Sequence, residues 1–196
     1  MANINLPNDY VKIDTLPEDP KDSEAYAVQT DSFSAYIMTF PISNERAMPF
    51  DNTEAIIQGI HKALGDEQGL IEVKNGVTHK SSPYVYSIVK SHKQPSGMQY
   101  ILALDVKEEN RVMHIQGYFD EMGVTGQRDA LVLNLLVNEG KLDFPPTSGW
   151  MEDPYDKTYD KGIPMNMSEK EEYDKMFLDH PLSQLRAVVR YIKENN

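Results

Sequence analysis

The strongest constraint on the fold is a series of strand-like runs that are separated only by short turns. Asn75-Gly76 is typical of a tight hairpin, and polar turns also interrupt the pattern at 94–97 and 108–110. Parallel neighbours need a long crossover connection, so strands joined this closely must run antiparallel. The sequence therefore predicts an antiparallel meander. Its strands are expected at 70–74, 77–80, 84–90, 98–106 and 111–119.

A hairpin and a helix precede or interrupt this pattern. Residues 25–30 and 33–40 flank an Asp31-Ser32 turn, and their side chains alternate as in paired strands. Both faces of 33–40 are partly apolar, so we expect this strand to be covered on both sides. Isoleucines at helical spacing predict a helix over 53–64.

Three further helices are predicted in the second half of the chain, and one is a short helix to about Met176 that begins with a capping box at Ser168-Glu169-Lys170-Glu171. Residues 126–138 are apolar around nearly the whole helix, which must therefore be covered on more than its sheet side. The final helix, 181–194, carries one apolar stripe and is the predicted cover. Its polar positions, Arg186, Arg190 and Lys193, are expected to face water.

The predicted fold class is α+β, an antiparallel β-sheet meander flanked by helices, with a helical C-terminal extension. Residues 1–24 are rich in acids and interrupted by Pro17 and Pro20, so we expect an acidic, extended N-terminal arm. Residues 25–140 are expected to form the α/β sandwich domain. Residues 141–196 are expected to form an irregular Tyr- and Asp-rich loop and two helices that pack back on the same domain.

The element order over 25–140, together with the 123–128 segment that begins the apolar helix, resembles the PsbP-like α/β/α sandwich. Photosystem extrinsic subunits and Ran-binding Mog-type proteins share that fold. The resemblance implies that the apolar helix packs back on the sheet, and that the chain binds other proteins rather than catalyses. It assigns no role to any individual residue.

Composition and charge narrow the classes of partner. Asp and Glu total 31 against 19 Lys and Arg, for a net charge of −12, which argues against nucleic acid. The chain has no Cys, which removes disulfides and thiolate sites. No apolar run predicts a membrane span, and the first residues do not resemble a signal peptide. We expect a soluble, cytoplasmic protein; a secreted or lipid-anchored protein whose leader has been removed is the alternative.

The irregular segment 144–167 is the predicted binding surface. Its aromatic side chains are of the kind that anchor interfaces, and the carboxylates around them would select a basic protein partner. We expect the rings to pack against the body of the protein and the carboxylates to point outward. The predicted contact residues are Trp150, Asp153, Tyr155, Asp156, Tyr159 and Asp160.

The acids of this segment also suggest a cation site. Glu152, Asp153, Asp156 and Asp160 carry oxygen ligands of the kind that Ca²⁺ prefers. Their spacing lacks the alternating acids, the central Gly and the late Glu of an EF-hand. A solvated acidic loop explains them better, so no metal ligand is predicted.

A second candidate for chemistry is the Asp179-His180-Pro181 run that begins the last helix. A histidine beside an aspartate suggests acid–base catalysis, with Ser183 as a nucleophile. Helix capping by Asp179 or His180 explains the same residues more simply, because proline suits the first helical turn. No catalytic residue and no cofactor are therefore predicted.

The favoured hypothesis is a non-enzymatic, acidic protein-binding protein, an adaptor or accessory, that uses the 144–167 loop and one sheet face. A more specific form is an immunity or inhibitor protein that neutralises a basic toxin or nuclease. The competing hypothesis is a metal-dependent or acid–base hydrolase that uses the 153–160 carboxylates and His180. The sequence leaves the oligomeric state open.

Overall fold

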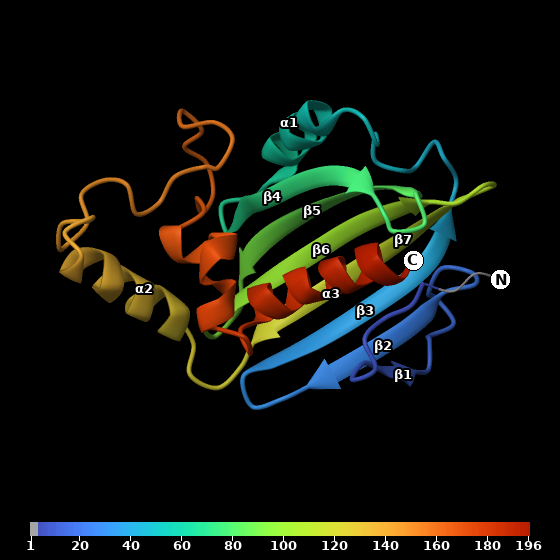
Figure 1. The fold of residues 1–196 in the computed structure, drawn as a ribbon, viewed down its shortest axis with the longest axis horizontal. Coiled ribbons are helices and arrows are strands. Elements are labelled where there is room, and N and C mark those ends of the chain that lie inside the picture. The colour runs from blue at the N-terminus through green and yellow to red at the C-terminus, as the bar shows by residue number, and fades with distance from the viewer. Residues whose placement is uncertain (1–3) are drawn as a thin grey trace.

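The computed structural model describes residues 4–196, which form one antiparallel sheet with helices on both sides (Figure 1). The α+β prediction is confirmed. The strand order is β1-β2-β3-β7-β6-β5-β4. The strands are β1 Val11–Ile13, β2 Glu24–Gln29, β3 Phe33–Ile42, β4 Gln68–Val77, β5 Pro83–His92, β6 Met98–Lys107 and β7 Val112–Glu121. The helices are α1 Thr53–Ala63, α2 Gln127–Asn138, η1 Met167–Glu169, η2 Glu171–Met176 and α3 Pro181–Asn195.

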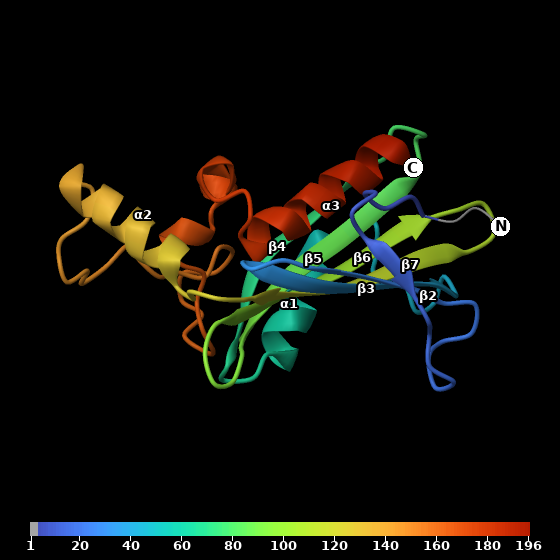
Figure 2. The ribbon, with the colours of Figure 1, turned by 90° about the horizontal axis from the view of Figure 1, so that it is seen from below.

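The two faces of the sheet are covered by different helices, as Figure 2 shows. Helix α3 lies across β3, β7 and β6 and closes the main core on one face. Helix α1 packs through Ile56 and Ile57 onto the β4–β5 end of the other face. The predicted stripe of α3 is fully buried against the sheet, and it consists of Leu182, Leu185, Val188, Val189 and Ile192.

Helix α2 lies away from the sheet, which corrects two expectations. It was expected to pack on the sheet and to be covered there by the last helix, but α3 itself occupies that face (Figures 1 and 2). Val132 and Leu136 of α2 pack instead against Tyr173 and Trp150 from the C-terminal segment. The apolar residues of α2 are spread around the helix, and Leu131 stays 52% exposed. The single stripe of α3 matches a flat sheet better.

The Asn75-Gly76 hairpin prediction is wrong, because both residues lie inside β4. Asn75 pairs with Val85, and Gly76 pairs with Tyr84. A Cβ atom on Gly76 would lie 2.8 Å from the Tyr84 hydroxyl oxygen, so the glycine makes room for that ring. The actual turn follows at 78–82, where the Thr78 N–H donates to the Ser82 carbonyl over 2.9 Å.

The N-terminal segment was expected to be an extended arm, but it also contributes to the sheet and to the core. Its strand β1 pairs with β2 at the sheet edge, and Ile4 and Tyr10 are buried in the main core. Lys12 and Glu24 form an ion pair of 2.7 Å across the two strands. Among residues 4–196, no helix combines the length and the apolar character needed to cross a membrane.

Candidate functional site

Aromatic side chains hold the 144–167 loop against the body of the protein. The Tyr155 hydroxyl oxygen lies 2.6 Å from the Val73 amide nitrogen and 3.2 Å from the Val73 carbonyl oxygen, so it bonds to the outer edge of β4. The Tyr159 ring stacks on His61 of α1 with 4.0 Å between ring centroids, and its hydroxyl donates to the His61 carbonyl over 2.9 Å. Trp150 packs beside α2. The loop is therefore anchored at three separate elements.

The expectation that the loop carboxylates point outward is wrong for Asp153. Its side chain is buried, and its Oδ2 lies 3.0 Å from Nε2 of His61. Its Oδ1 accepts from the backbone N–H groups of Tyr155 and Asp156, each over 2.9 Å. Asp153 therefore shapes the loop from inside. Of the predicted acids, Asp156 and Asp160 are exposed.

Asp156 also stabilises its own turn. Its Oδ1 accepts from the Thr158 hydroxyl over 2.7 Å and from the Thr158 N–H over 2.9 Å. These two hydrogen bonds lower the pKa of the Asp156 carboxyl below its usual value. An ionised carboxylate therefore stays at the loop surface.

An open cavity of about 320 Å³ lies against the loop, next to these anchors. Trp150, Tyr155 and Met167 supply aromatic and thioether walls, and Lys157 and Lys170 supply cations at its margin. Tryptophan, tyrosine and methionine favour adaptable apolar contacts. The loop thus offers a concave apolar surface with charges around it.

The sheet face on the α1 side carries a row of apolar and aromatic side chains that crosses all seven strands. Directly paired residues of antiparallel strands point to the same face, so the register defines the row. Only its last two members lie in the cluster under α1, and Tyr118 is 38% exposed. The row consists of Val11, Ala27, Tyr36, Tyr118, Ile101, Val89 and Leu70.

The part of this face on β1, β2, β3, β7 and β6 is called the open face below. In the part of the chain that the structure describes, no helix covers it (Figure 2). A hollow of about 500 Å³ lies at its edge and is lined by Val11, Ile13, Tyr36 and Tyr118 among others. The expectation that residues 33–40 are covered on both sides is therefore wrong, because α3 covers one side only.

A buried ion network ties the C-terminal segment together. Arg128 and Arg186 both reach Oδ1 of Asp174, from 3.0 Å and 3.1 Å. Other N–H groups of Arg128 donate to the Ser183 hydroxyl, over 2.9 Å, and to the Ser168 carbonyl, over 2.7 Å. With its donors used internally, this arginine positions the segment rather than binding an external anion.

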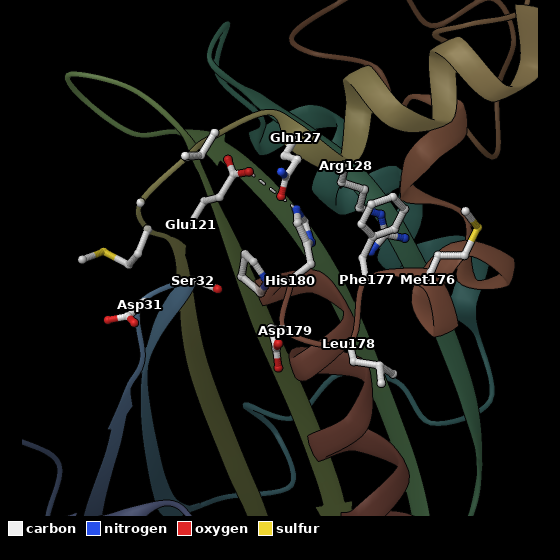
Figure 3. A pocket seen from close by; sticks show the side chains of 14 residues that line it. Asp31, Ser32, Glu121, Gln127, Arg128, Met176, Phe177, Leu178, Asp179 and His180 are labelled. Atoms are coloured by element: carbon white, nitrogen blue, oxygen red, sulfur yellow. Dashed lines mark ion pairs between the residues drawn. The ribbon is translucent and has the colours of Figure 1, made fainter.

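A cavity of about 480 Å³ lies where β7 ends and where α2 and α3 begin (Figure 3). Glu121 and His180 face each other there, with 3.8 Å between Oε1 and Nε2, marked by the dashed line. Burial, together with Arg128 and Arg186, lowers the pKa of His180 to about 3, so its ring is neutral at pH 7. Burial raises the pKa of the Glu121 carboxyl.

The residues of the hydrolase hypothesis contact different parts of the structure. Asp153 pairs with His61 of α1, whereas His180 lies beside Glu121 of β7. The Ser183 hydroxyl is buried between Arg128 and Asp174 and faces no cavity described above. Residues 4–196 contain no group of three or more His, Asp or Glu side chains placed to hold a metal ion.

Sequence reasoning expected one sheet face to take part in binding but did not identify its residues, and it missed the Glu121–His180 pair. The two apolar faces of 33–40 were a signal for the open face, but they were interpreted as a sign of full burial. Glu121 and His180 come from distant segments, and the local signals at His180 were the neighbouring Asp179 and helix capping. That capping is present, since Nδ1 of His180 accepts from the Leu182 N–H over 3.2 Å.

Comparisons with known proteins identify likeness of fold only. No family model matches the chain, and no curated protein matches it. A Pseudomonas aeruginosa protein of unknown function, PA94, has a TM-score of 0.39 and 9% identity over 71% of this chain and 99% of its own. The Saccharomyces cerevisiae Ran-binding protein Mog1p has a TM-score of 0.38 and 10% identity over 66% of this chain and 75% of its own.

The cyanobacterial PsbP (CyanoP) from Synechocystis has a TM-score of 0.38 and 13% identity over 67% of this chain and 79% of its own. Both groups named from the element order are thus among the similar structures. Similarity at this level carries no inference about activity or partners.

Proposed function

We propose that this chain is a non-enzymatic binding protein that docks another protein on its open face. The carrying observation is the row of Val11, Ala27, Tyr36, Tyr118 and Ile101, which continues the apolar surface under α1 onto the open face. The free face of an antiparallel sheet usually alternates to polar residues. A continuous apolar and aromatic row at that place is typical of a protein interface.

The side chains of the open face suit a docking surface. Tyr36 and Tyr118 pair directly across β3 and β7 at the centre of the row. Tyrosine is among the residues that contribute most to binding free energy, because it combines a large rigid ring with a polar end. Met38 and Gln116 form the next pair along the same strands and enlarge the surface.

The charges around the open face favour a basic partner. The Asp19 carboxylate lies close enough to Tyr36 to help burial raise the pKa of that hydroxyl. Asp9 lines the hollow at the same edge, where Asp120 is paired with Lys93. With a net charge of −12 on the whole chain, these acids would speed the approach of a basic protein. An inhibitor of a basic toxin or nuclease is the specific form that this argument supports.

The 144–167 loop would add a second contact on the same side. It lies beside α1, on the α1 side of the sheet (Figure 2). Its exposed members include Tyr155, at 41% exposed, with Asp156 and Asp160. The aromatic anchors order the loop in advance, which lowers the entropy lost on binding.

Photo-crosslinking in the native host tests this proposal. A benzophenone amino acid replaces Tyr118 on the open face or, as a control, Val77, a strand residue that is 64% exposed at the end of β4. We expect a defined cross-linked protein from position 118 and none from position 77. The partner so identified should bind the Ile101→Glu variant about tenfold more weakly or worse.

Equal cross-linking from both positions, or undiminished affinity of the Ile101→Glu variant, would reject the open face as the docking surface. Circular dichroism of each variant checks that the fold is retained. Ile101 is partly exposed, so its replacement leaves the main core intact.

A further inference from the structure

The cavity of Figure 3 is separate from the proposed docking surface. Glu121 pairs with Phe33, whose side chain lies in the core on the α3 side of the sheet. The open face lies on the opposite side. The walls of the cavity come from the 31–32 turn, the 121–128 segment and the beginning of α3. Its chemistry is therefore independent of the docking argument.

His180 presents a hydrogen-bond donor to this cavity. Its Nδ1 accepts from the Leu182 N–H, so the proton of the neutral ring is assigned to Nε2. The side chain is only 10% exposed. Among residues 4–196, Nε2 has no hydrogen-bond acceptor, since the nearest carboxylate oxygen, Oε1 of Glu121, is 3.8 Å away. A nearly buried donor therefore faces the cavity without a partner.

Glu121 presents acceptors beside this donor. Its side chain is 7% exposed, Oε1 accepts from the Gly126 N–H over 2.8 Å, and Oε2 accepts from the Met98 N–H over 3.2 Å. Each carboxylate oxygen has a second lone pair, so both can accept another hydrogen bond. Two backbone donors fix the carboxylate in place. Donor and acceptor thus stand side by side in a rigid arrangement.

We propose that this cavity binds a neutral ligand group that accepts a hydrogen bond from His180 and donates one to Glu121, that is, a carboxamide or a hydroxyl. An anion is disfavoured, because it would face the Glu121 carboxylate. A cation is disfavoured, because it would meet the His180 N–H and the field of the buried Arg128. A group with both functions satisfies both side chains.

The mouth of the cavity suits the non-polar part of such a ligand. Val124 is 78% exposed, Leu178 is 67% exposed and Met176 is 56% exposed, and all three line the cavity. Large apolar side chains with this much exposure lose contact with water when a ligand stem covers them. The cavity therefore combines a polar floor with an apolar rim, as ligand sites commonly do.

Nitrogen-15 NMR of the histidine ring tests the proposal. The probes are N-acetyl-asparagine methylamide for the carboxamide, methyl glucoside for the hydroxyl, and butylammonium and acetate as the charged alternatives. We expect a saturable shift of His180 Nε2 with one or both neutral probes. The neutral probe that binds more tightly shows whether the ligand group is a carboxamide or a hydroxyl. A shift with a charged probe alone, or with no probe, would overturn the proposal.

Two variants test the role of the histidine. His180→Asn keeps an acceptor for the Leu182 N–H but removes the ring donor, so it should weaken the neutral probe about tenfold. His79→Asn makes the same change at an exposed histidine that does not line the cavity, and it should leave binding unchanged. Unchanged binding in the His180→Asn variant, or weakened binding in the His79→Asn variant, contradicts the proposed role of His180.

Discussion

Arg186 of α3 reaches Glu72 of β4 over 3.2 Å, from Nη2 to Oε2, and both side chains are buried. The same guanidinium reaches Asp174 of η2 over 3.1 Å and donates to the Glu169 carbonyl over 2.9 Å. One arginine thus connects the last helix to the sheet and to the segment before it. The sequence-based expectation that Arg186 faces water is wrong, because its partners come from other parts of the chain.

Replacing Arg186 tests whether this network holds the C-terminal segment. Arg186→Ala leaves Glu72 and Asp174 buried with fewer partners, and breaking a buried pair in this way costs about 3–5 kcal/mol. Urea unfolding should show that loss of stability. Arg190→Ala is the matched control, since Arg190 is 45% exposed on the same helix and its pairs are 3.6 Å and 3.9 Å long. Its cost should stay below about 1 kcal/mol. Similar losses from both variants would show that the network adds little.

The Lys90–Glu169 pair predicts coupling between two substitutions. The two side chains are each 1% exposed and lie 2.7 Å apart. Lys90→Met leaves the Glu169 carboxylate buried without its cation, which should cost about 3–5 kcal/mol. Adding Glu169→Gln removes that charge and keeps an acceptor for the Asn166 N–H. The double variant should therefore be more stable than Lys90→Met alone. A double-mutant cycle from chemical unfolding measures this coupling, and strictly additive losses would contradict it.

Much of the fold could be predicted because its signals are local. The antiparallel meander followed from strand-like runs joined by short turns, and the stripe of α3 followed from helical spacing. Asn75-Gly76 misled because the same dipeptide fits a strand when a neighbouring ring, that of Tyr84, needs the space above the glycine. Local sequence cannot show that neighbour.

The site was less predictable because it depends on contacts between distant residues. The predicted capping by Ser168 is replaced by capping from Asn166, whose amide oxygen accepts from the Ser168 N–H while Glu169 bonds back to the Asn166 N–H. The loop aromatics were identified from composition. Their partners, Val73 and His61, were not, because the pattern of one segment does not specify which edge or helix it will contact.

The Tyr155 hydroxyl predicts a local effect at the sheet edge. Tyr155→Phe removes both hydrogen bonds to Val73 and should lower stability by about 1 kcal/mol. Amide hydrogen exchange should show faster exchange at Val73 and through the loop. Tyr159→Phe provides a comparison, since its ring can still stack on His61 after the hydroxyl is lost. Unchanged protection of the Val73 amide in Tyr155→Phe would mean that the loop is not held by this contact.

The neutral His180 predicts a pH dependence of stability. Its pKa falls from 6.5 to about 3 on folding, so the unfolded state binds the proton more readily between these values. The contribution is fully present above pH 6.5 and is lost as the pH falls towards 3, by at most about 1.4 kcal/mol per pH unit. The raised pKa of Glu121 acts in the opposite direction, because the folded state then binds that proton more readily.

Comparing wild type with His180→Asn isolates the histidine, since both proteins retain Glu121. Urea unfolding across this pH range should give a shallower acid-side loss of stability in the variant. Asparagine can still cap α3 at this position, so the helix should be retained. Parallel curves of unfolding free energy against pH for the two proteins would show that His180 does not cause the loss of stability at acidic pH.

Gly123 and Gly126 provide a matched pair for testing the wall of the Glu121–His180 cavity. Both have positive φ, +64° and +72°, so alanine at either position costs about 1–2 kcal/mol of backbone strain. A Cβ atom at 123 would also lie 2.8 Å from the Asp31 carbonyl oxygen, whereas a Cβ atom at 126 meets nothing within 4 Å. The 31–32 turn cannot easily move away, because the Ser32 carbonyl accepts from the Met122 N–H over 3.0 Å.

Gly123→Ala should therefore be less stable than Gly126→Ala by roughly 1–3 kcal/mol, the usual cost of an added buried methyl group. Chemical unfolding of the two variants measures the difference directly. Equal losses would mean that the turn yields to the extra atom. In that case the part of the cavity wall that the 31–32 turn forms is deformable.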